Sequence, residues 1–397
     1  MIIEKLSLSN FRNYSNALVN IQPGLNILVG ENAQGKTNFL EAIELLSTGK
    51  SSRSSIEADF IQHGRNKMHI EMHFKARGVQ EDLALSFFNE EQMLLDLGLE
   101  NDLTNSKPKR RKVSVNGVTY SLLKKLRGRL ITVTFNSFDL NLIRGGPVYR
   151  REWIDSVIVR LKPAFYEQLS KYQKIVQQRN KLLKSLFETN HLSARDTDQL
   201  DVWDEQVAKY GAHIIIWRRK ILHELITKAR YFLSLMSEQS ELLAISYRCR
   251  SLQKNNAHIK QAERNNFHDL EVLEPAVNQH SQSEEEKIVA LDLLYSLKHR
   301  RLEELVRGQT LSGPHRDDVI FLLNNQEATS FASQGQQRSL VLALKLSELE
   351  LVKEHLLEPP VLLLDDVLAE LDLKRQSLLM SQIGSDMQTV ISTTHVS

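Results

Sequence analysis

The chain has 397 residues with 51 Lys and Arg against 49 Asp and Glu, so its net charge of +2 argues neither for nor against a nucleic-acid partner. Its one cysteine, Cys249, excludes an intrachain disulfide and a cysteine-based zinc site, and favours a cytoplasmic location. There is no signal-peptide pattern and no run of 18 apolar residues, so we expect neither secretion nor a membrane span.

The first nine residues alternate between apolar and polar side chains, which predicts a strand. This strand runs into the segment Asn10-Phe11-Arg12-Asn13-Tyr14. Arg12 is either an ordinary surface residue or a neighbour of a ligand bound at the next strand, because a first strand in such a sheet would run close to the second. Its position alone leaves both interpretations open.

Residues 30–37 have the form G-x-x-x-x-G-K-T of a phosphate-binding P-loop. A strand-like run, residues 25–29, precedes the motif and a helical pattern follows it, which is the context that it requires. The glycines allow backbone N–H groups to point at the phosphates of ATP, at the positive end of a helix. The predicted cofactor-binding residues here are Gly30, Glu31, Asn32, Ala33, Gln34, Gly35, Lys36 and Thr37.

Within this motif, Lys36 is expected to reach the outer phosphates, and the Thr37 hydroxyl to ligate Mg²⁺. The alternative is a glycine turn that matches the motif by coincidence. In the polar loop that follows, residues 49–55, Arg53 faces phosphate or DNA, or is simply solvated.

Strand-like runs at residues 68–74 and 83–88 precede a hairpin signal, Asn116-Gly117 between alternating residues. The basic run 107–112 lies at the edge of this hairpin. It either contacts a phosphate backbone or is a solvated edge that resists strand pairing.

From residue 150 to about residue 238 apolar residues recur at helical spacing, interrupted by a polar stretch, residues 190–201, that we interpret as a loop. Two long helices joined by one loop predict an antiparallel pair. A strand is predicted at residues 244–249, and helix again at residues 284–306, after a polar and loosely patterned stretch from residue 255.

Near the end of the chain, a strand at residues 319–323 and a helix from Ser333 are followed by a continuous apolar run, residues 361–364, which ends in Asp365 and Asp366. Such a run predicts a central strand that is buried on both faces. Carboxylates at its carboxyl end form a Walker B arrangement, with Asp365 placed to hold Mg²⁺ through water; an acidic surface turn is the alternative. We expect this strand to neighbour the P-loop strand in one sheet, although most of the chain lies between them.

One helix ahead of the acidic strand, Ser333-Gln334-Gly335-Gln336 resembles the signature motif of ABC-type ATPases. Ser333 can cap its helix, and Gly335 allows a phosphate to approach closely. In that superfamily this face closes on the nucleotide of a second subunit. Residues 369–372 resemble the D-loop of the same ATPases. His395, at the end of a strand predicted from residue 389, is placed like their switch histidine, although a terminal histidine is often incidental.

Motifs along nearly the whole chain resemble the RecF family, bacterial recombination mediators related to the SMC and Rad50 ATPases. Besides the segments above, they comprise residues 145–147, 150–155, 178–183, 203–212, 312–318 and 364–374. The chain departs from the family pattern at residues 136–140, which lack a proline, and at Trp153, which replaces a smaller aromatic residue. The resemblance implies an α/β fold: an ABC-type, Rad50-like P-loop ATPase head assembled from both chain ends, with an inserted helical lobe. The implied domains are residues 1–148, 149–240 and 241–397.

The resemblance also implies an ATP-dependent homodimer that binds single-stranded and gapped or junction DNA. With RecR and RecO partners, it would help to load RecA in repair, replication restart and the SOS response. Arg12, Ser333, Gly335 and Gln336 join the predicted cofactor-binding residues, and Asp366 and Lys36 are the predicted catalytic residues. Hydrolysis is expected to be slow, because Asp366 stands where many ABC ATPases carry a glutamate and holds the attacking water less favourably.

Two alternatives remain: an ABC-type ATPase subunit of another complex, for transport or chromosome maintenance, and a P-loop kinase. The DNA contacts are the least defined part of the prediction, because helical surfaces carry basic residues in any case. The candidates are Lys109–Lys112, Arg150, Arg151, Arg218, Arg219 and Lys220.

Overall fold

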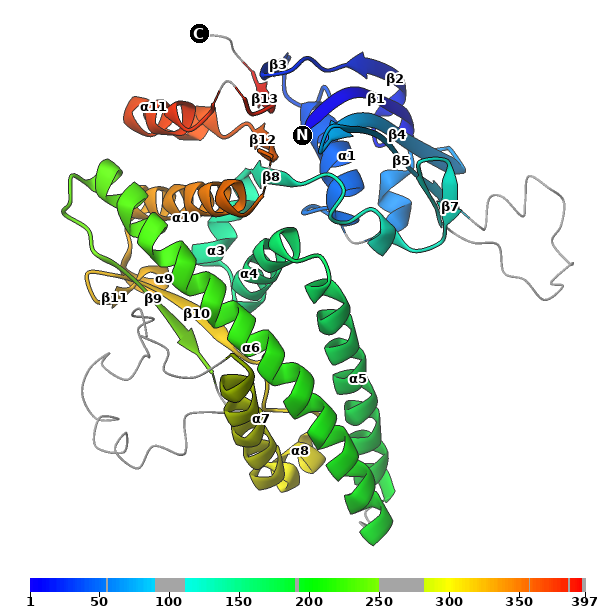
Figure 1. Ribbon diagram of the computed structural model, residues 1–397, viewed down its shortest axis with the longest axis vertical. Coiled ribbons are helices and arrows are strands. Elements are labelled where there is room, and N and C mark those ends of the chain that lie inside the picture. The colour runs from blue at the N-terminus through cyan, green and yellow to red at the C-terminus, as the bar shows by residue number, and fades with distance from the viewer. Residues whose placement is uncertain are drawn as a thin grey trace, which may run out of the picture. The chain divides into compact units, whose positions relative to one another are not determined.

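The computed structural model describes residues 1–54, 56–89, 111–189, 193–249, 282–356, 358–384 and 386–394. The chain forms two compact units (Figure 1): Met1–Asp139 together with Glu348–Ser397, and Leu140–Ser347. Both chain ends therefore belong to one unit, as predicted. The division into domains at residues 148 and 240 stays a prediction.

The first unit contains a parallel four-stranded sheet in the order β3 (Leu25–Val29), β13 (Thr389–Thr393), β12 (Val361–Asp365) and β8 (Thr132–Phe135). Residues 361–364 of β12 are buried, as their continuous apolar run predicts. The expectation that β3 and β12 are neighbours is wrong, because β13 lies between them and pairs with both. Its register still aligns the carboxyl ends of the three strands, with Ser392 opposite Asp365 and Thr393 opposite Val29.

An antiparallel sheet in the same unit has the order β2 (Tyr14–Asn20), β1 (Ile2–Phe11), β4 (Lys67–Ala76), β5 (Val79–Phe88), β6 (Arg111–Val115) and β7 (Val118–Tyr120). Buried and accessible residues alternate along β4, so one face forms core and the other is open. The first strand lies in this sheet and not in that of β3, contrary to expectation. The β6–β7 hairpin is confirmed: Asn116 and Gly117 have φ of 49° and 78°, as a type I′ turn requires.

Helix α1 (Lys36–Thr48) follows the P-loop and contacts strands of both sheets through buried residues that include Phe39, Ile43 and Leu46. It ends at Gly49, whose φ of 68° and N–H bond to Leu45 form a left-handed C-cap. The other elements of this unit are η1 (Glu57–Phe60), η2 (Leu123–Lys125), η6 (Leu368–Glu370) and α11 (Leu373–Ser381); η3 (Ser137–Leu140) lies at the boundary.

The second unit is mainly helical. Its helices are α3 (Asn141–Arg144), α4 (Pro147–Leu161), α5 (Phe165–Thr189), α6 (Ala194–Ser237), α7 (Gln282–His299), α8 (Arg301–Arg307), α9 (Ala328–Phe331) and α10 (Gln334–His355), which continues into the first unit. A small antiparallel sheet has the order β11 (Gln326–Glu327), β10 (Asp318–Leu323) and β9 (Leu243–Arg248). None of the helices that the structure describes combines the length and apolarity that crossing a bilayer requires.

Helices α5 and α6 lie side by side and run in opposite directions (Figure 1), as predicted. The expectation of a loop over residues 190–201 is wrong from residue 194 onward, because α6 begins at Ala194. Ser193 caps this helix: its hydroxyl accepts a bond from the Asp196 N–H, and the Asp196 carboxylate accepts one from the Ser193 N–H. A strong cap thus starts the helix within a stretch whose polarity suggested a loop.

A buried ionic cluster joins three of these helices. The guanidinium of Arg179 on α5 lies 2.7 Å from Asp204 on α6 and 2.6 Å from Glu304 on α8, and all three side chains are fully buried. Arg301 pairs with the second oxygen of Asp204 at 2.5 Å. Burial raises the pKa of Glu304. Because removing one partner would leave a buried charge uncompensated, at about 3–5 kcal/mol, the cluster ties the helices together.

Candidate functional site

Two left-handed residues shape the loop between β3 and α1. Ala33 has φ 65° and Gly35 has φ 106°. This backbone conformation at Gly35 favours glycine, and a Cβ atom there would lie 2.6 Å from the side-chain nitrogen of Asn13, which would have to move. Gly30 is different: its φ is not positive, and a Cβ atom would meet only Gln34 at 3.8 Å. The predicted steric role of glycine is therefore confirmed for Gly35 alone.

The β1–β2 hairpin supports this loop. The Tyr14 hydroxyl donates to the Gly35 carbonyl at 3.1 Å, and the Asn13 amide donates to the Gln34 carbonyl at 3.2 Å. Asn38, in the first turn of α1, donates to Asn13 Oδ1 at 2.8 Å. Residues 13 and 14 of the segment 10–14, which the sequence marks as a motif, therefore hold the loop between β3 and α1 in place.

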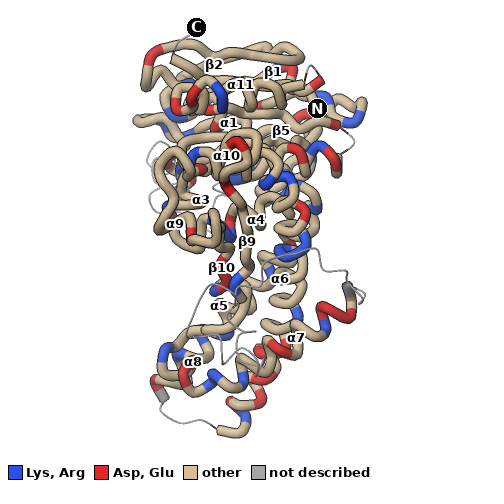
Figure 2. The backbone as a smooth tube through the Cα atoms, turned by 90° about the vertical axis from the view of Figure 1, so that its left-hand side faces the viewer, with Lys and Arg blue, Asp and Glu red and all other residues tan. Residues whose placement is uncertain are grey.

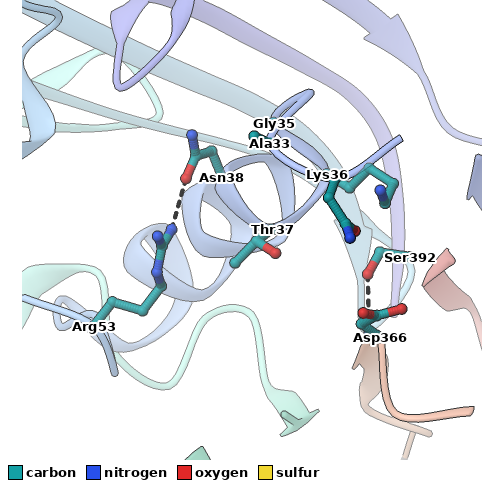
Figure 3. Close-up of a pocket in the computed structure, with 9 residues that line it drawn as sticks. Ala33, Gly35, Lys36, Thr37, Asn38, Arg53, Asp366 and Ser392 are labelled. Atoms are coloured by element: carbon teal, nitrogen blue, oxygen red, sulfur yellow. Dashed lines mark hydrogen bonds between the residues drawn. The ribbon is translucent and has the colours of Figure 1, made fainter. Parts of the chain in front are cut away.

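A cavity of about 280 Å³ opens at the start of α1 (Figure 3). Its lining combines five predicted loop residues with four others: Asn32, Ala33, Gly35, Lys36 and Thr37, then Asn38, Arg53, Asp366 and Ser392. Gly35 is the N-cap of α1, and no side chain in the described part of the protein bonds to the N–H groups of the first turn. The positive end of the helix therefore faces the cavity, as an anion site requires. Gly30, Glu31 and Gln34 belong to the loop but do not line the cavity.

Lys36 lies along the loop. Its ammonium donates to the carbonyls of Gly30 at 2.6 Å and Glu31 at 2.8 Å. Neutral carbonyls hold this cation, so its charge is not neutralised by a carboxylate contact among the described residues. It can therefore exchange these acceptors for phosphate oxygens.

The acidic end of β12 meets the P-loop. Thr37 Oγ1 donates to Asp365 Oδ1 at 2.9 Å, and Ser392 Oγ donates to the same oxygen at 2.8 Å. Ser392 Oγ in turn accepts a bond from the Asp366 N–H at 2.9 Å (Figure 3). The two residues predicted to hold Mg²⁺, Thr37 and Asp365, are therefore brought together, whereas metal binding itself stays a prediction.

Asp366 is exposed, lines the cavity and has φ of 55°. A non-glycine residue in this conformation is uncommon, and such residues cluster at functional sites. The Ser392 contacts hold it there. Sequence reasoning missed Ser392; the available signal was a small polar residue at the carboxyl end of a strand adjacent to β12.

Arg12 and Arg53 share the carboxylate of Glu41, whose side chain on α1 is only 2% exposed. Arg12 forms a two-point contact with Glu41 at 2.7 and 3.0 Å, and Arg53 lies 3.3 Å from its second oxygen. Arg53 also donates to Asn38 Oδ1 at 2.6 Å (Figure 3) and lines the cavity, whereas Arg12 does not. Glu41 thus shares its charge between two arginines, and Arg53 brings a cation to the cavity. A nucleotide contact by Arg12 stays a prediction.

The signature-like segment lies on the surface of the second unit. Ser333 Oγ accepts from the Gln336 N–H at 3.3 Å, and the Ser333 N–H donates to the Gln336 side chain at 2.8 Å, so a reciprocal cap begins α10. The capping role of Ser333 is confirmed, and Gln336 has a structural role there. A Cβ atom on the exposed Gly335 would meet nothing within 4 Å. Within its own unit this glycine is therefore not required by packing.

In the D-loop-like segment, Asp372 caps α11 by accepting a bond from the Arg375 N–H at 2.9 Å. His395 lies outside the described residues.

Two candidate DNA contacts prove to be structural. Arg150 is buried and pairs with Asp318 at 2.8 Å, and Arg218 is buried and pairs with Asp155 at 2.7 Å. A buried, paired guanidinium is not available to a phosphate backbone, so assigning these residues to DNA is wrong. Arg151 is partly accessible and donates to the Asp317 carbonyl at 2.7 Å.

The remaining candidates are more accessible. Arg219 is half-buried, and Lys220 is exposed with its ammonium 5.1 Å from the centre of the Trp217 ring. In the basic run, Arg111 pairs with Glu57 at 3.1 Å and Lys112 is exposed, whereas residues 109 and 110 lie outside the described part of the chain. Figure 2 shows Lys and Arg interspersed with Asp and Glu along most elements, so charge distribution alone does not mark a DNA-binding face.

Comparisons with known proteins agree with this geometry. A family model described as an AAA ATPase domain matches residues 1–350. The DNA replication and repair protein RecF of Rippkaea orientalis is 38% identical over 403 residues, which cover 100% of this chain and 94% of that protein. A solved structure of the recombination mediator protein RecF with ATP, in the RecFOR pathway, is 29% identical with a TM-score of 0.81, and covers 100% of this chain and 92% of that one. An SMC head bound to the C-winged helix domain of ScpA, 12% identical over 100% of this chain and 90% of that one with a TM-score of 0.50, shows likeness of fold alone.

Proposed function

The chain belongs to the RecF family of DNA replication and repair proteins, and on that premise we propose that it is an ATP-dependent DNA-binding protein of recombinational repair. The observation that carries this proposal is the contact between Thr37 and Asp365 at the mouth of a cavity that faces the N-terminus of α1. It joins the two halves of a nucleotide site within one unit.

The donor set suits ATP and Mg²⁺. The first N–H groups of α1 and the Lys36 ammonium supply positive charge for a triphosphate, and the Thr37 hydroxyl and the Asp365 carboxylate are the hard oxygen ligands that Mg²⁺ prefers. A bound Mg²⁺ would neutralise phosphate charge. Asp366 is exposed in the cavity, where it would hold the attacking water and accept its proton. Its short side chain supports slow hydrolysis, suited to a switch.

We propose that the signature-like segment of one chain contacts the ATP bound in the P-loop cavity of a second copy. Ser333 and Gly335 are exposed, and no packing within their own unit explains the glycine. An approaching phosphate would explain it, because glycine permits the closest backbone approach. ATP would then lie between two protomers, each contributing a different face.

In the cell, we propose that the dimer binds single-stranded and gapped or junction DNA. The solved relative is described as a recombination mediator of the RecFOR pathway. We therefore propose RecR and RecO as partners in helping to load RecA, with roles in gap repair, replication restart and SOS induction.

A gel-shift experiment with gapped duplex, with and without Mg-ATP, tests this function. We expect retardation that requires ATP and is lost in Lys36→Arg. A subunit of a transport complex or a P-loop kinase would leave the DNA unshifted. Retardation that is the same without nucleotide would contradict the role of ATP.

A further inference from the structure

The open face of the six-stranded sheet carries a feature that the nucleotide site does not use. A hollow of about 670 Å³ extends over the outward side chains of β1, β4, β5, β6 and β7, which are labelled in Figure 1 except for β6. A second hollow of about 470 Å³ shares Phe88, Lys112 and Thr119 with it. The larger hollow, whose lining holds Lys67, Phe88 and Lys112, is here called the sheet trough.

The floor of the sheet trough is made of small side chains. Ala84, Ser86 and Ser114 project from neighbouring strands, and Ser86 lies opposite both His69 on β4 and Lys112 on β6. His69 Nδ1 lies 2.9 Å from Ser86 Oγ. A floor of such residues lets an extended ligand lie close to the sheet, while longer side chains rise on either side.

Two lysines border this floor. Lys67 on β4 and Lys112 on β6 are exposed and stand two strands apart, about 10 Å in the direction of pairing. Within the described part of the chain, neither ammonium lies within 4 Å of a carboxylate. Burial lowers the pKa of His69 and both lysines lower it further, whereas Glu71 raises it. Glu71 also lines the trough, 4.0 Å from His69 Nε2, so two lysine cations stand against one carboxylate among the lining residues.

An aromatic ring accompanies these cations. Phe88 lies opposite Lys67 and is half-buried, with the Lys67 ammonium 5.5 Å from the centre of its ring. Tyr120 lines only the second hollow; it lies opposite the buried Val113 and so belongs to the other face of the sheet. Rings on a β-sheet beside lysines suit unstacked bases and the phosphates that join them. Duplex DNA keeps its bases stacked, and an acidic peptide has no bases to place on the ring.

We propose that the sheet trough binds single-stranded nucleic acid, with phosphates at Lys67 and Lys112 and an unpaired base on Phe88. The inference rests on the proposed DNA-binding function and locates its single-stranded contact. It also gives a specific role to Lys112, the exposed last residue of the basic run 107–112. A gapped substrate would then be recognised partly through its unpaired strand.

Fluorescence anisotropy with a labelled oligothymidylate of about 16 nucleotides, the upper range of site sizes for single-strand binding folds, measures this contact. In the double variant Lys67→Gln, Lys112→Gln, the slope of log affinity against log salt should become shallower by about 1.4, since each phosphate contact contributes about 0.7. Phe88→Leu keeps apolar volume but loses the ring, and should weaken binding about fivefold or more. Lys75→Gln, an exposed lysine on β4 outside the trough, is the matched control and should bind as the parent chain does.

Circular dichroism and ATP-dependent dimerisation, measured on the same variants, establish that they are folded. Binding by the double variant or by Phe88→Leu that equals that of the parent chain overturns the inference. If polyglutamate of equal charge displaces the oligonucleotide as effectively as unlabelled oligothymidylate does, the inference is overturned in favour of an acidic peptide. A parent chain that shifts gapped duplex with ATP but does not bind oligothymidylate overturns the inference and leaves ATP-dependent binding of gapped DNA standing. Binding to neither substrate contradicts both the inference and the proposed function.

Discussion

Thr37 and Asp365 are 328 residues apart in the sequence, yet the Thr37 hydroxyl donates a hydrogen bond of 2.9 Å to Asp365 Oδ1. The same oxygen accepts a bond of 2.8 Å from Ser392. Two neutral donors thus orient one carboxylate at the carboxyl ends of adjacent parallel strands, which is where ligands bind in open α/β sheets. The contact also explains why both ends of the chain are needed for one site.

Asp365→Asn tests whether this carboxylate serves a metal. The amide oxygen can still accept from Thr37 and Ser392, so the shape is kept and only the charge is lost. We expect ATP affinity in Mg²⁺ to fall by about tenfold or more, with little change in EDTA. Titration with a fluorescent ATP analogue in both media measures this. Ser392→Ala is the control, since it removes one donor and keeps the charge; an Asn variant with unaltered Mg²⁺ dependence would exclude Asp365 as a metal ligand.

Lys36→Arg and Ser333→Ala should distinguish ATP binding from the dimerisation and hydrolysis that follow it. The larger, planar guanidinium cannot reproduce the point charge of Lys36 within the loop, so we expect ATP-dependent dimerisation to be abolished. Ser333→Ala should impair dimerisation and hydrolysis while ATP binding persists, because Ser333 is assigned to the nucleotide of the second protomer. Light scattering at saturating Mg-ATP gives the mass; two variants that dimerise like the parent chain would refute the assignment.

Two glycine substitutions make a matched pair. In Gly35→Ala the backbone with φ 106° is strained for alanine, and the new Cβ atom would displace the Asn13 side chain that bonds to the loop, so ATP binding should be lost. In Gly335→Ala the Cβ atom meets nothing within 4 Å, so alanine should not destabilise α10. Gly335→Ala should therefore keep or raise the melting temperature and still weaken the ATP-dependent dimer. An unimpaired dimer would remove the argument for close approach at Gly335.

Asp366→Asn addresses hydrolysis alone. Asparagine tolerates the left-handed conformation that Asp366 adopts, and its backbone N–H can still bond to Ser392. Without a carboxylate to accept a proton from water, turnover should fall by about 100-fold or more, while ATP binding and dimerisation continue. Phosphate release under single-turnover conditions measures this. A variant that hydrolyses ATP at the parental rate would place the base elsewhere.

The features of the fold and the site that the sequence predicted are those with local signals. The P-loop, the buried strand before Asp365 and the turn at Asn116-Gly117 each depend on a few neighbouring residues. The position of β13 between β3 and β12 has no such signal, because strand order is fixed by pairing between distant segments.

The assignment of Arg150 and Arg218 to DNA was wrong for the same reason. The residues around Arg150 do not predict its partner Asp318, and those around Arg218 do not predict its partner Asp155. These ion pairs make it possible to bury each guanidinium. The start of α6 is a different error: the Ser193–Asp196 capping pattern was present in the sequence, but the polarity of the stretch was given more weight than its cap.

His315 makes the stability of the second unit depend on pH. Its Nε2–H donates to the Thr310 carbonyl at 3.1 Å, so Nδ1, 2.6 Å from the Tyr172 hydroxyl, is the acceptor of a neutral ring. Burial, opposed by the Thr310 bond, lowers the pKa of His315 to about 4.

As pH falls below the ordinary histidine pKa of about 6.5, the unfolded chain therefore takes up a proton that the native state binds only near pH 4. Stability should decrease across that interval, by at most on the order of 3 kcal/mol. Urea unfolding at several pH values between 7 and 4 measures the loss. His315→Gln should remove this part of the pH dependence, whereas the exposed His299→Gln should keep it. Parallel pH profiles for His315→Gln and the parent chain would show that the ring titrates alike in the native and unfolded states.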